Sequence, residues 1–342
     1  MKIIKRKLLI CSVVLAMALS VFSASAFAAE KQVYISGQSI GIAILSDGLI
    51  VTKAVEVKDK DGKRVFPAAE AGIRPGDVIK SINGVAIKDA RHFSSLVNDS
   101  KGDAVSITYQ RGDSTKTVNV NPCYDAESEE YKLGILVRDG TSGIGTLTFV
   151  DAENSRYGAL GHSVNDACTG IIIPVQDGNI TNATIRDIIK SKNGSPGELS
   201  GAFDLLNPTG SIDKNNEFGI YGDFYNTKAL DSMRLIPIAT GDEIKIGKAE
   251  IYCTLDDNVA DYYEINVIKI NSQSKKDVKG MVIEVTDPRL IEKTGGIVQG
   301  MSGSPIIQDG KLIGAVTHVM INDTLRGYGM FIEWMVDEAK VS

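Results

Sequence analysis

The segment Gly300–Pro305, with the sequence GMSGSP, places Ser302 between flanking glycines. A serine hydroxyl becomes a nucleophile when a neighbouring base removes its proton, and acyl transfer also needs main-chain N–H groups aimed at the developing oxyanion. Glycine allows the sharp turn that would bring the N–H groups of Gly300 and Ser302 together. The segment therefore predicts Ser302 as a nucleophile, with an oxyanion hole formed by Gly300 and Ser302.

A histidine is the expected base, and only His162 and His318 lie in the C-terminal part of the chain. His162 follows the strand-like segment GTLTFVD and its turn, among small neighbours that would leave its ring accessible. His318 lies on the apolar segment GAVTHV, where it would line the substrate cleft or belong to the core. Because His162 is paired with the Ser302 loop, triad logic predicts His162 as the base.

The third member of a serine triad is a buried carboxylate that fixes the imidazole tautomer. Asp151, Asp166 and Asp287 are the candidates. Asp287 ends the strand-like segment GMVIEVTD, whereas Asp166, close behind His162, would also suit a turn cap. Residue types and spacing rank these three carboxylates only weakly, so all three stay open at this point.

Ser304 is the competing nucleophile, but Pro305 restricts it to extended geometry, and we expect it to shape the loop. An α/β-hydrolase elbow is excluded, because its G-x-S-x-G pattern would need glycine at position 304.

The elements that must position these residues are short strands. From Leu133 onward, apolar runs alternate with turns, which predicts antiparallel sheets in a barrel or sandwich over residues 133–342. Within residues 133–342, helical spacing is visible only at FIEWMVDEA near the C-terminus.

Residues 38–122 form a second, compact pattern. The hairpin signal Asn83-Gly84 and a helical segment over Asp89–Asp99 accompany the string AEAGIRPGDVIKSINGVAI. This string resembles bacterial PDZ domains. The resemblance implies that the N–H groups of Ser39, Ile40, Gly41 and Ile42 grip a peptide carboxylate while the peptide adds a strand to the sheet. A β-rich spacer that binds nothing is the alternative.

The N-terminal residues 1–29 carry a basic head, an apolar run over residues 8–22 and the small-residue site Ala26-Phe27-Ala28. These are the parts of a secretory signal, and they predict export with cleavage near Ala28. Extension of the apolar run through Ala29 leaves a retained membrane anchor as the alternative.

Composition limits the remaining classes of function. The 342 residues are 43% hydrophobic, enough for two domains with cores, and the net charge of −6 argues against nucleic-acid binding. Cys123, Cys168 and Cys253 are far apart and cannot all pair, which indicates free thiols. With three histidines in all, a zinc site has little support, and we expect no metal or cofactor.

Several strings together carry a second resemblance: GALGH at residues 158–162, GSPGE at 194–198, VTDPRLIEKTGGIVQGMSGSPI at 285–306, and GAVTHV at 314–319. They are similar to the SpoIVB peptidase family of endospore-forming bacteria. The resemblance implies a mainly β chain with an N-terminal signal or anchor, a PDZ domain and a chymotrypsin-like double-β-barrel serine peptidase domain. It also implies a serine endopeptidase with His162, Asp287 and Ser302 as the catalytic residues.

The same resemblance implies self-cleavage after export across the inner forespore membrane, with the membrane contacted only through the N-terminal segment. It further implies cleavage of a regulator of a membrane metalloprotease, which leads to processing of a late mother-cell sigma factor. The PDZ unit would then recognise the protein's own N-terminal region or a partner's tail. The alternative is a non-catalytic exported PDZ scaffold with an inactive peptidase fold.

Overall fold

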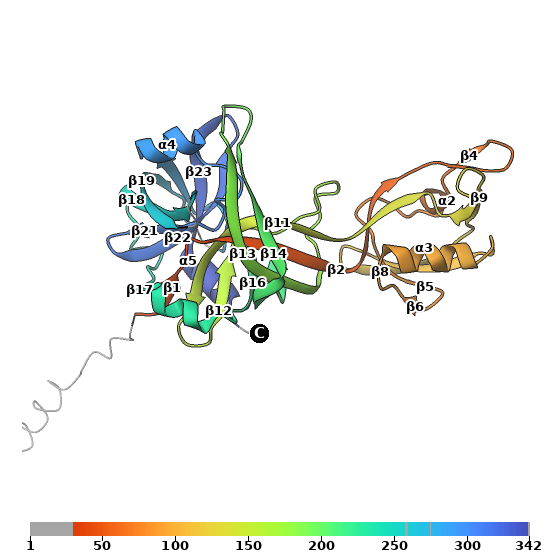
Figure 1. Ribbon diagram of the computed structural model, residues 1–342, viewed down its shortest axis with the longest axis horizontal. Helices are drawn as coiled ribbons and strands as arrows, with labels where there is room; N and C mark the ends of the chain where they lie inside the picture. Colours follow the sequence, from red (N-terminus) through yellow and green to blue (C-terminus); the bar gives the residue numbers. More distant parts are fainter. Residues whose placement is uncertain (1–29, 257–258, 274, 341–342) are drawn as a thin grey trace, which may run out of the picture. The chain divides into compact units, whose positions relative to one another are not determined.

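The computed structural model in Figure 1 describes residues 30–256, 259–273 and 275–340. The predicted secretory signal or anchor at residues 1–29 lies outside these described residues. No helix in the described ranges combines the length and the apolar character that crossing a bilayer demands. The architecture is mainly β, as predicted.

The PDZ unit contains the local elements that its sequence predicts. β5 (Val78–Ile82) and β6 (Val85–Ala86) form a hairpin through Asn83 and Gly84, whose φ values of 50° and 77° are those that a tight turn requires. α3 (Ala90–Asp99) begins after Asp89, which accepts a hydrogen bond from an N–H of the first turn. The other elements of this unit are β3 (Val57–Lys58), β4 (Arg64–Val65), α2 (Pro67–Glu70), β7 (Val105–Arg111), β8 (Ser114–Val120), β9 (Cys123–Asp125) and β10 (Glu130–Lys132).

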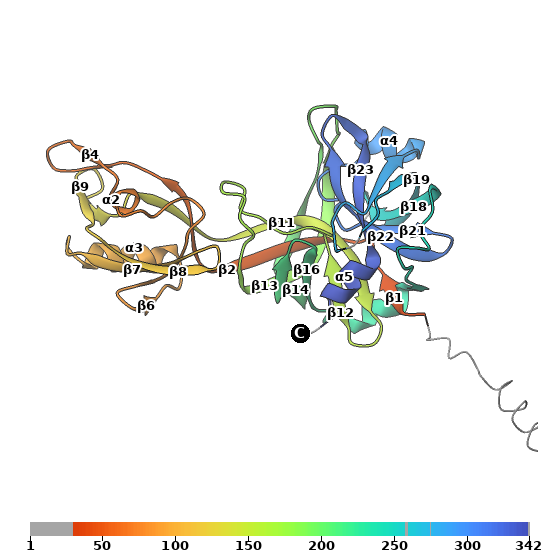
Figure 2. The same ribbon diagram turned by 180° about the vertical axis from the view of Figure 1, so that it is seen from behind.

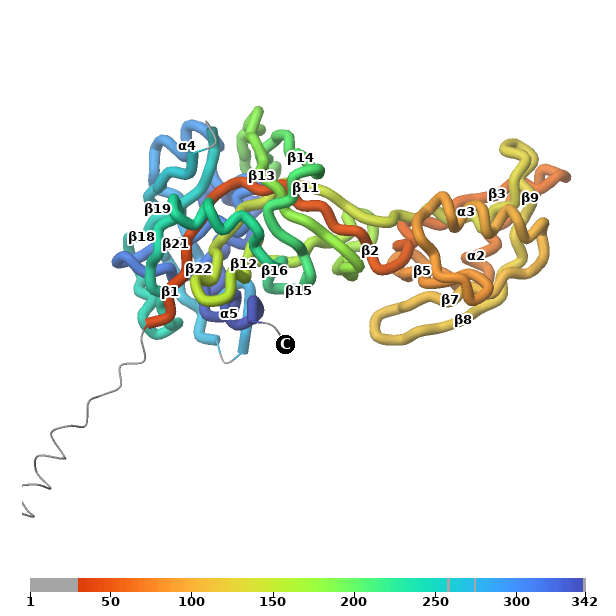
Figure 3. The backbone as a smooth tube through the Cα atoms, turned by 60° about the horizontal axis from the view of Figure 1, so that its bottom comes forward, coloured from red at the N-terminus to blue at the C-terminus, as the bar shows by residue number. Residues whose placement is uncertain are grey.

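β2 (Ser39–Ala54) is shared between the PDZ unit and the rest of the chain. Figure 3 traces its course. Its first half pairs with β11 (Ile135–Asp151) on one side and with β13 (Val175–Ile189) on the other. Its residues 49 and 50 pair with β5 of the PDZ unit. β1 (Gln32–Ile35), which precedes it, pairs with β11 and with β17 (Arg234–Pro237).

The PDZ unit is therefore inserted in the chain between β2 and β11, two strands that pair with each other. The predicted domain limits of 38–122 and 133–342 stay a prediction. The strand pairing adds one feature to them: β1 and the first half of β2 pair with strands that follow the insert.

The structure contradicts the predicted carboxylate-binding loop at Ser39, Ile40, Gly41 and Ile42. Ile40, Gly41 and Ile42 lie in β2 with a strand on each side, so their main-chain groups serve the two ladders, and Ser39 begins β2 opposite Thr146 of β11. Ile40 and Ile42 are buried, and a Cβ placed on Gly41 would lie 2.2 Å from the ring of Phe203. A carboxylate has no access to N–H groups in this position.

The remaining strands complete a 13-stranded sheet and a separate closed barrel, seen from behind in Figure 2. The sheet also takes in β12 (Arg156–Ala159), β14 (Glu198–Ser211), β15 (Lys214–Asn216) and β16 (Gly219–Asp223), and the short 3-10 helix η1 (Thr227–Ser232) follows. The barrel strands, in spatial order, are β18 (Gly247–Thr254), β19 (Ala260–Ile270), β20 (Met281–Val285), β23 (Asp323–Phe331), β22 (Lys311–Met320) and β21 (Pro305–Gln308).

Two helices complete the barrel half of the chain. α4 (Pro288–Thr294) stands between β20 and β21, immediately before the Ser302 loop. α5 (Ile332–Glu338) confirms the helix predicted near the C-terminus, and Ile332, Met335 and Val336 bury its apolar face. The barrel interior is filled by aliphatic side chains, among them Ile251, Ile265, Ile283 and Val316.

Candidate active site

The Ser302 loop is held by β11, a long strand of the sheet. Gly300 and Gly303 have φ values of +96° and +94°, which gives the sharp turn that the sequence predicts. The hydroxyl of Thr146 on β11 donates to the carbonyl of Gly300 at 2.8 Å, and the hydroxyl of Thr148 donates to that of Gly303 at 2.7 Å. Strand β11 therefore fixes both ends of the loop that presents Ser302.

His162 lies on a second turn that packs against the Ser302 loop. Leu160 and Gly161, which follow β12, each have a φ of 70°, an unusual value for leucine. The N–H of Leu160 donates to the carbonyl of Thr146 at 3.3 Å. The α-carbon of Gly303 lies so close to this turn that an added Cβ would stand 2.5 Å from the main-chain nitrogen of Leu160.

The imidazole of His162 is oriented by a main-chain group. Its Nδ1 lies 2.8 Å from the carbonyl oxygen of Ser163. Because a carbonyl oxygen only accepts, Nδ1 carries the proton and Nε2 keeps the lone pair that a general base needs. Burial lowers the pKa of His162, so the ring is neutral and basic near pH 7.

Ser302 and His162 line the same cleft, which has a volume of about 290 Å³. Its other walls are uncharged and combine aliphatic side chains, among them Ile42, Ile144 and Leu160, with polar ones such as Asn165 and Gln299. The structure therefore brings the predicted nucleophile and the predicted base to one place.

In this structure the Ser302 hydroxyl donates to the carbonyl of Thr317 at 2.9 Å. Next to Thr317 on β22 stands His318, whose ring centroid is 5.1 Å from that of His162. Burial, followed by the charges of His162 and Lys279, lowers the pKa of His318 to about 4. His318 thus stands beside His162 as a neutral ring, and it is not among the residues that line the cleft.

The predicted oxyanion hole stays a prediction. Gly300 and Ser302 both line the cleft, and within the described ranges no hydrogen bond occupies either N–H. The N–H of Gly303, in contrast, is bound to the carbonyl of Val316 at 2.8 Å. Ser304 is fully buried and donates to the carbonyl of Met301 at 2.6 Å, which confirms its predicted part in shaping the loop.

Asp287 has partners other than the catalytic histidine. Its carboxylate caps α4 by accepting from the N–H of Arg289 at 2.8 Å, and the guanidinium of Arg289 lies 2.9 Å from it. It also accepts from the N–H of Glu264 at 3.2 Å. The Arg289 hydrogen bond is the main reason that the pKa of Asp287 lies below its ordinary value. In the described part of the chain nothing joins Asp287 to His162, so its role as the triad acid stays a prediction that this geometry does not favour.

The two other candidate carboxylates serve turns. Asp166 is wholly buried and accepts from the N–H groups of Cys168 and Thr169 and from Arg138. It therefore organises the loop that follows His162. Asp151 accepts from the N–H of Glu153 at the turn after β11.

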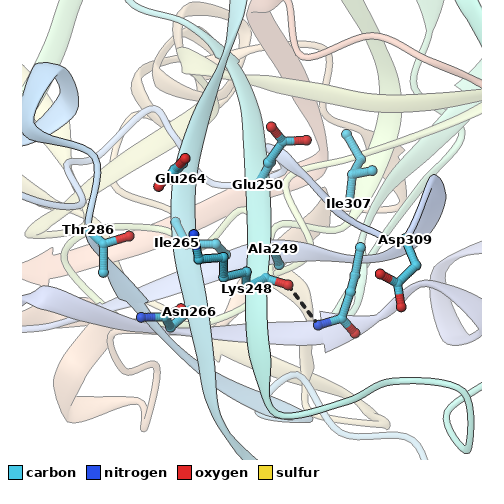
Figure 4. Close-up of a pocket in the computed structure, with 10 residues that line it drawn as sticks. Lys248, Ala249, Glu250, Glu264, Ile265, Asn266, Thr286, Ile307 and Asp309 are labelled. Atoms are coloured by element: carbon cyan, nitrogen blue, oxygen red, sulfur yellow. Dashed lines mark hydrogen bonds between the residues drawn. The ribbon is translucent and has the colours of Figure 1, made fainter.

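A further pocket of about 390 Å³ lies on the barrel strands β18, β19 and β21 (Figure 4). Charged and polar residues line it together with Ala249, Ile265 and Ile307. The side chain of Gln308 donates to the carbonyl of Lys248 at 3.0 Å. None of the predicted catalytic residues lines it. Among the residues with described positions, no group of three or more potential metal-ligating side chains occurs.

Sequence reasoning missed several contributors to the site. The carbonyl of Ser163 is a main-chain group and carries no residue-type signal. Thr146 and Thr148 are two residues apart on one strand, a spacing that could have indicated a shared face, but their partners lie far along the chain.

Comparison with known proteins extends these observations. The model of the family described as SpoIVB peptidase S55 matches residues 129–336, more than half of the chain, and the PDZ domain model matches residues 40–121. A curated relative from Neisseria meningitidis serogroup A / serotype 4A, named as a zinc metalloprotease, is 32% identical over 56 residues. That match covers 16% of this chain and 13% of the relative, so it spans a small part of the relative's length.

Two solved structures are among those similar to this chain. The PDZ domain of the SdrC-like protein of Listeria monocytogenes is 29% identical and covers 27% of this chain and 90% of its own, with a TM-score of 0.22. The active form of the Rv3671c protease of M. tuberculosis is 11% identical and covers 59% of this chain and 76% of its own, with a TM-score of 0.33. The extent of the peptidase family match is what decides the assignment: the chain belongs to the SpoIVB peptidase S55 family and carries a PDZ domain.

Proposed function

We propose that this protein is an exported serine endopeptidase that recognises peptides through its PDZ domain. One observation carries the proposal: Ser302 and His162 line one cleft, and Ser163 holds the Nδ1 proton so that Nε2 is free to act as a base. The family match over residues 129–336 supports the same reaction.

In the proposed reaction, the Ser302 hydroxyl turns from the Thr317 carbonyl to Nε2 of His162. As Oγ bonds to the scissile carbonyl carbon, its proton passes to Nε2 and the carbonyl electron pair moves to oxygen. The N–H groups of Gly300 and Ser302 stabilise this oxyanion. Collapse expels the amine, which takes the proton from the imidazolium. Water, deprotonated by His162, then attacks the ester, and the departing Ser302 oxygen recovers a proton.

In this arrangement the carbonyl of Ser163, in place of a carboxylate, fixes the tautomer of His162. A carbonyl dipole stabilises the imidazolium less than a carboxylate does, because it carries no net charge. Asp287 would supply that charge only after leaving Arg289. The reaction as proposed therefore requires Ser302 and His162, and the need for Asp287 is a separate question.

Labelling with a serine-directed phosphonate tests the proposal, with the modified residue mapped by mass spectrometry. Wild type and the matched variant Ser304→Ala should be labelled at Ser302, and Ser302→Ala should not. Ser302→Ala should also lose several orders of magnitude of peptidase rate, since removal of one triad member has that cost. The non-catalytic scaffold alternative gains support, and the proposal fails, when wild type stays unlabelled or when Ser302→Ala retains the peptidase rate.

We propose further that the protein acts in sporulation. This finer proposal draws on family membership: export across the inner forespore membrane, self-cleavage, and cleavage of a regulator of a membrane metalloprotease, upstream of a late mother-cell sigma factor. In an endospore-forming host, Ser302→Ala should leave the exported protein present but uncut and block processing of the sigma factor. Normal processing in that strain would refute the sporulation role.

A further inference from the structure

The edge of β2 inside the PDZ unit is occupied by the protein itself. We name residues 133–138, which lead into β11 and form its start, the strap. Its residues pair antiparallel with the second half of β2, with Ile135 opposite Ala54 and Val137 opposite Val51. The hydroxyl of Thr52 donates to the carbonyl of Leu136 at 3.2 Å. The strap therefore adds a strand to the PDZ unit.

The strap also lies against α3, the helix that faces this edge. Ile135 and Val137 pack on the PDZ core that contains Phe93 and Val97 of α3, whereas Leu136, between them, is 52% exposed. The strap and α3 together line a groove of about 270 Å³. Alternate burial of an extended segment between a strand edge and a helix is how a peptide binds by strand addition.

We propose that the strap is the resident occupant of the PDZ peptide site, and that a peptide ligand binds there only by displacing it. The inference rests on the proposed role of the PDZ domain in peptide recognition. The strap indicates the kind of ligand: an extended segment with branched aliphatic residues at alternate positions, which pairs antiparallel with this half of β2.

The strap is connected to the loop behind the catalytic histidine. At its end, the guanidinium of Arg138 lies 3.1 Å from the carboxylate of Asp166, which is wholly buried and binds the N–H groups of Cys168 and Thr169. Displacement of the strap withdraws this cation from a buried carboxylate, which leaves that charge poorly compensated. Peptide binding to the PDZ domain is thereby linked to the loop that begins at His162.

A reversible covalent lock tests the displacement. Lys53 and Leu136 are directly opposite each other and both are exposed, so the pair Lys53→Cys/Leu136→Cys should form a disulfide with little disturbance of the core. The matched control is Lys53→Ser/Leu136→Ser, with Cys123 and Cys168 replaced by serine in both proteins. The probe is a labelled peptide of sequence KLGILV, that of residues 132–137, with a free carboxylate, and its affinity is measured by fluorescence anisotropy.

Oxidation of the cysteine pair should weaken binding of the peptide at least tenfold, reduction should restore it, and the serine pair should not respond to the reductant. Equal affinity in the locked and reduced protein would overturn the proposal. Phosphonate labelling of Ser302 in the same samples distinguishes this proposal from the proposed function. If Ser302 is labelled but the peptide affinity does not change on oxidation, the strap proposal is refuted and the peptidase proposal stands.

Arg138→Met tests the link to the catalytic loop. In the reduced protein, saturating peptide should change the rate of phosphonate labelling at least threefold, and Arg138→Met should abolish that change while the peptide still binds. An undiminished response in Arg138→Met, or no response in the wild type, would refute the link.

Discussion

Replacement of Gly303 by alanine tests whether direct contact aligns the nucleophile and base loops. At its φ of +94°, an added Cβ would lie 2.3 Å from the carbonyl oxygen of Thr146 and 2.5 Å from the nitrogen of Leu160. Both are main-chain atoms, so no side chain can rotate away. Relief of these contacts requires the Ser302 loop or the His162 turn to move by roughly 1 Å, a displacement that costs about 100-fold in rate when catalytic groups lose alignment.

Gly310→Ala is the matched control. Gly310 has a φ of +79°, and no atom lies within 4 Å of an added Cβ. Alanine at this position therefore introduces the same kind of backbone strain as at Gly303 but no steric clash. That strain is about 1–2 kcal/mol for an L-residue in the left-handed region. Gly310→Ala should therefore lose about 1–2 kcal/mol in the free energy of unfolding and keep kcat/KM within about threefold of wild type.

Urea unfolding and kcat/KM on a peptide substrate, corrected by phosphonate titration for the fraction of active protein, separate the two effects. Gly303→Ala should be less stable than Gly310→Ala, and its surviving folded fraction should show kcat/KM about 100-fold below wild type. If folded Gly303→Ala matches Gly310→Ala in kcat/KM, the two loops are not aligned by this contact and the reasoning is refuted.

Two other predictions concern charge. Burial lowers the pKa of His162 below the ordinary histidine pKa of about 6.5. The ring therefore stays neutral at pH values somewhat below 6.5. kcat/KM should fall only as the pH drops through a midpoint lower than 6.5. A midpoint above it would indicate a carboxylate against the ring. Asp287→Asn removes an ion pair whose Arg289 partner is half exposed, so we expect a loss of about 1 kcal/mol in urea unfolding. Since the pKa of Asp287 is lowered by folding, this stabilisation is present above pH ~3.9 and disappears as the pH falls through the native pKa. A shift of the His162 midpoint in Asp287→Asn would instead show that Asp287 acts on the imidazole directly.

Local signals in the sequence predicted local structure. Asn83-Gly84 requires a tight turn whatever surrounds it, and Asp89 caps the helix whose spacing was visible in the chain. The glycines around Ser302 predicted a sharp turn for the same reason, and their positive φ values confirm it. His162 was predicted from its pairing with that loop, and the shared cleft is consistent with that choice.

Non-local structure was beyond reach of the same reasoning. The alternating pattern of Ser39–Leu45 is typical both of a strand next to an open loop and of a strand with two neighbours, and only the distant residues of β11 and β13 decide between them. Asp287 illustrates the reverse case. Its partner Arg289 lies only two residues away in the sequence, but the triad interpretation did not consider that residue.

The insertion of the PDZ unit sets an order of assembly. Ser39–Leu45 emerges from the ribosome long before Gly140–Thr146, its partner on β11, so until then it is an unpaired edge open to aggregation. Contacts inside the insert are closer in sequence and should form earlier. The threonines that hold the Ser302 loop are positioned only after this delayed pairing, and the loop itself is synthesised later still. A nascent chain therefore completes its PDZ unit well before the Ser302 loop and the strand that holds it are both in place.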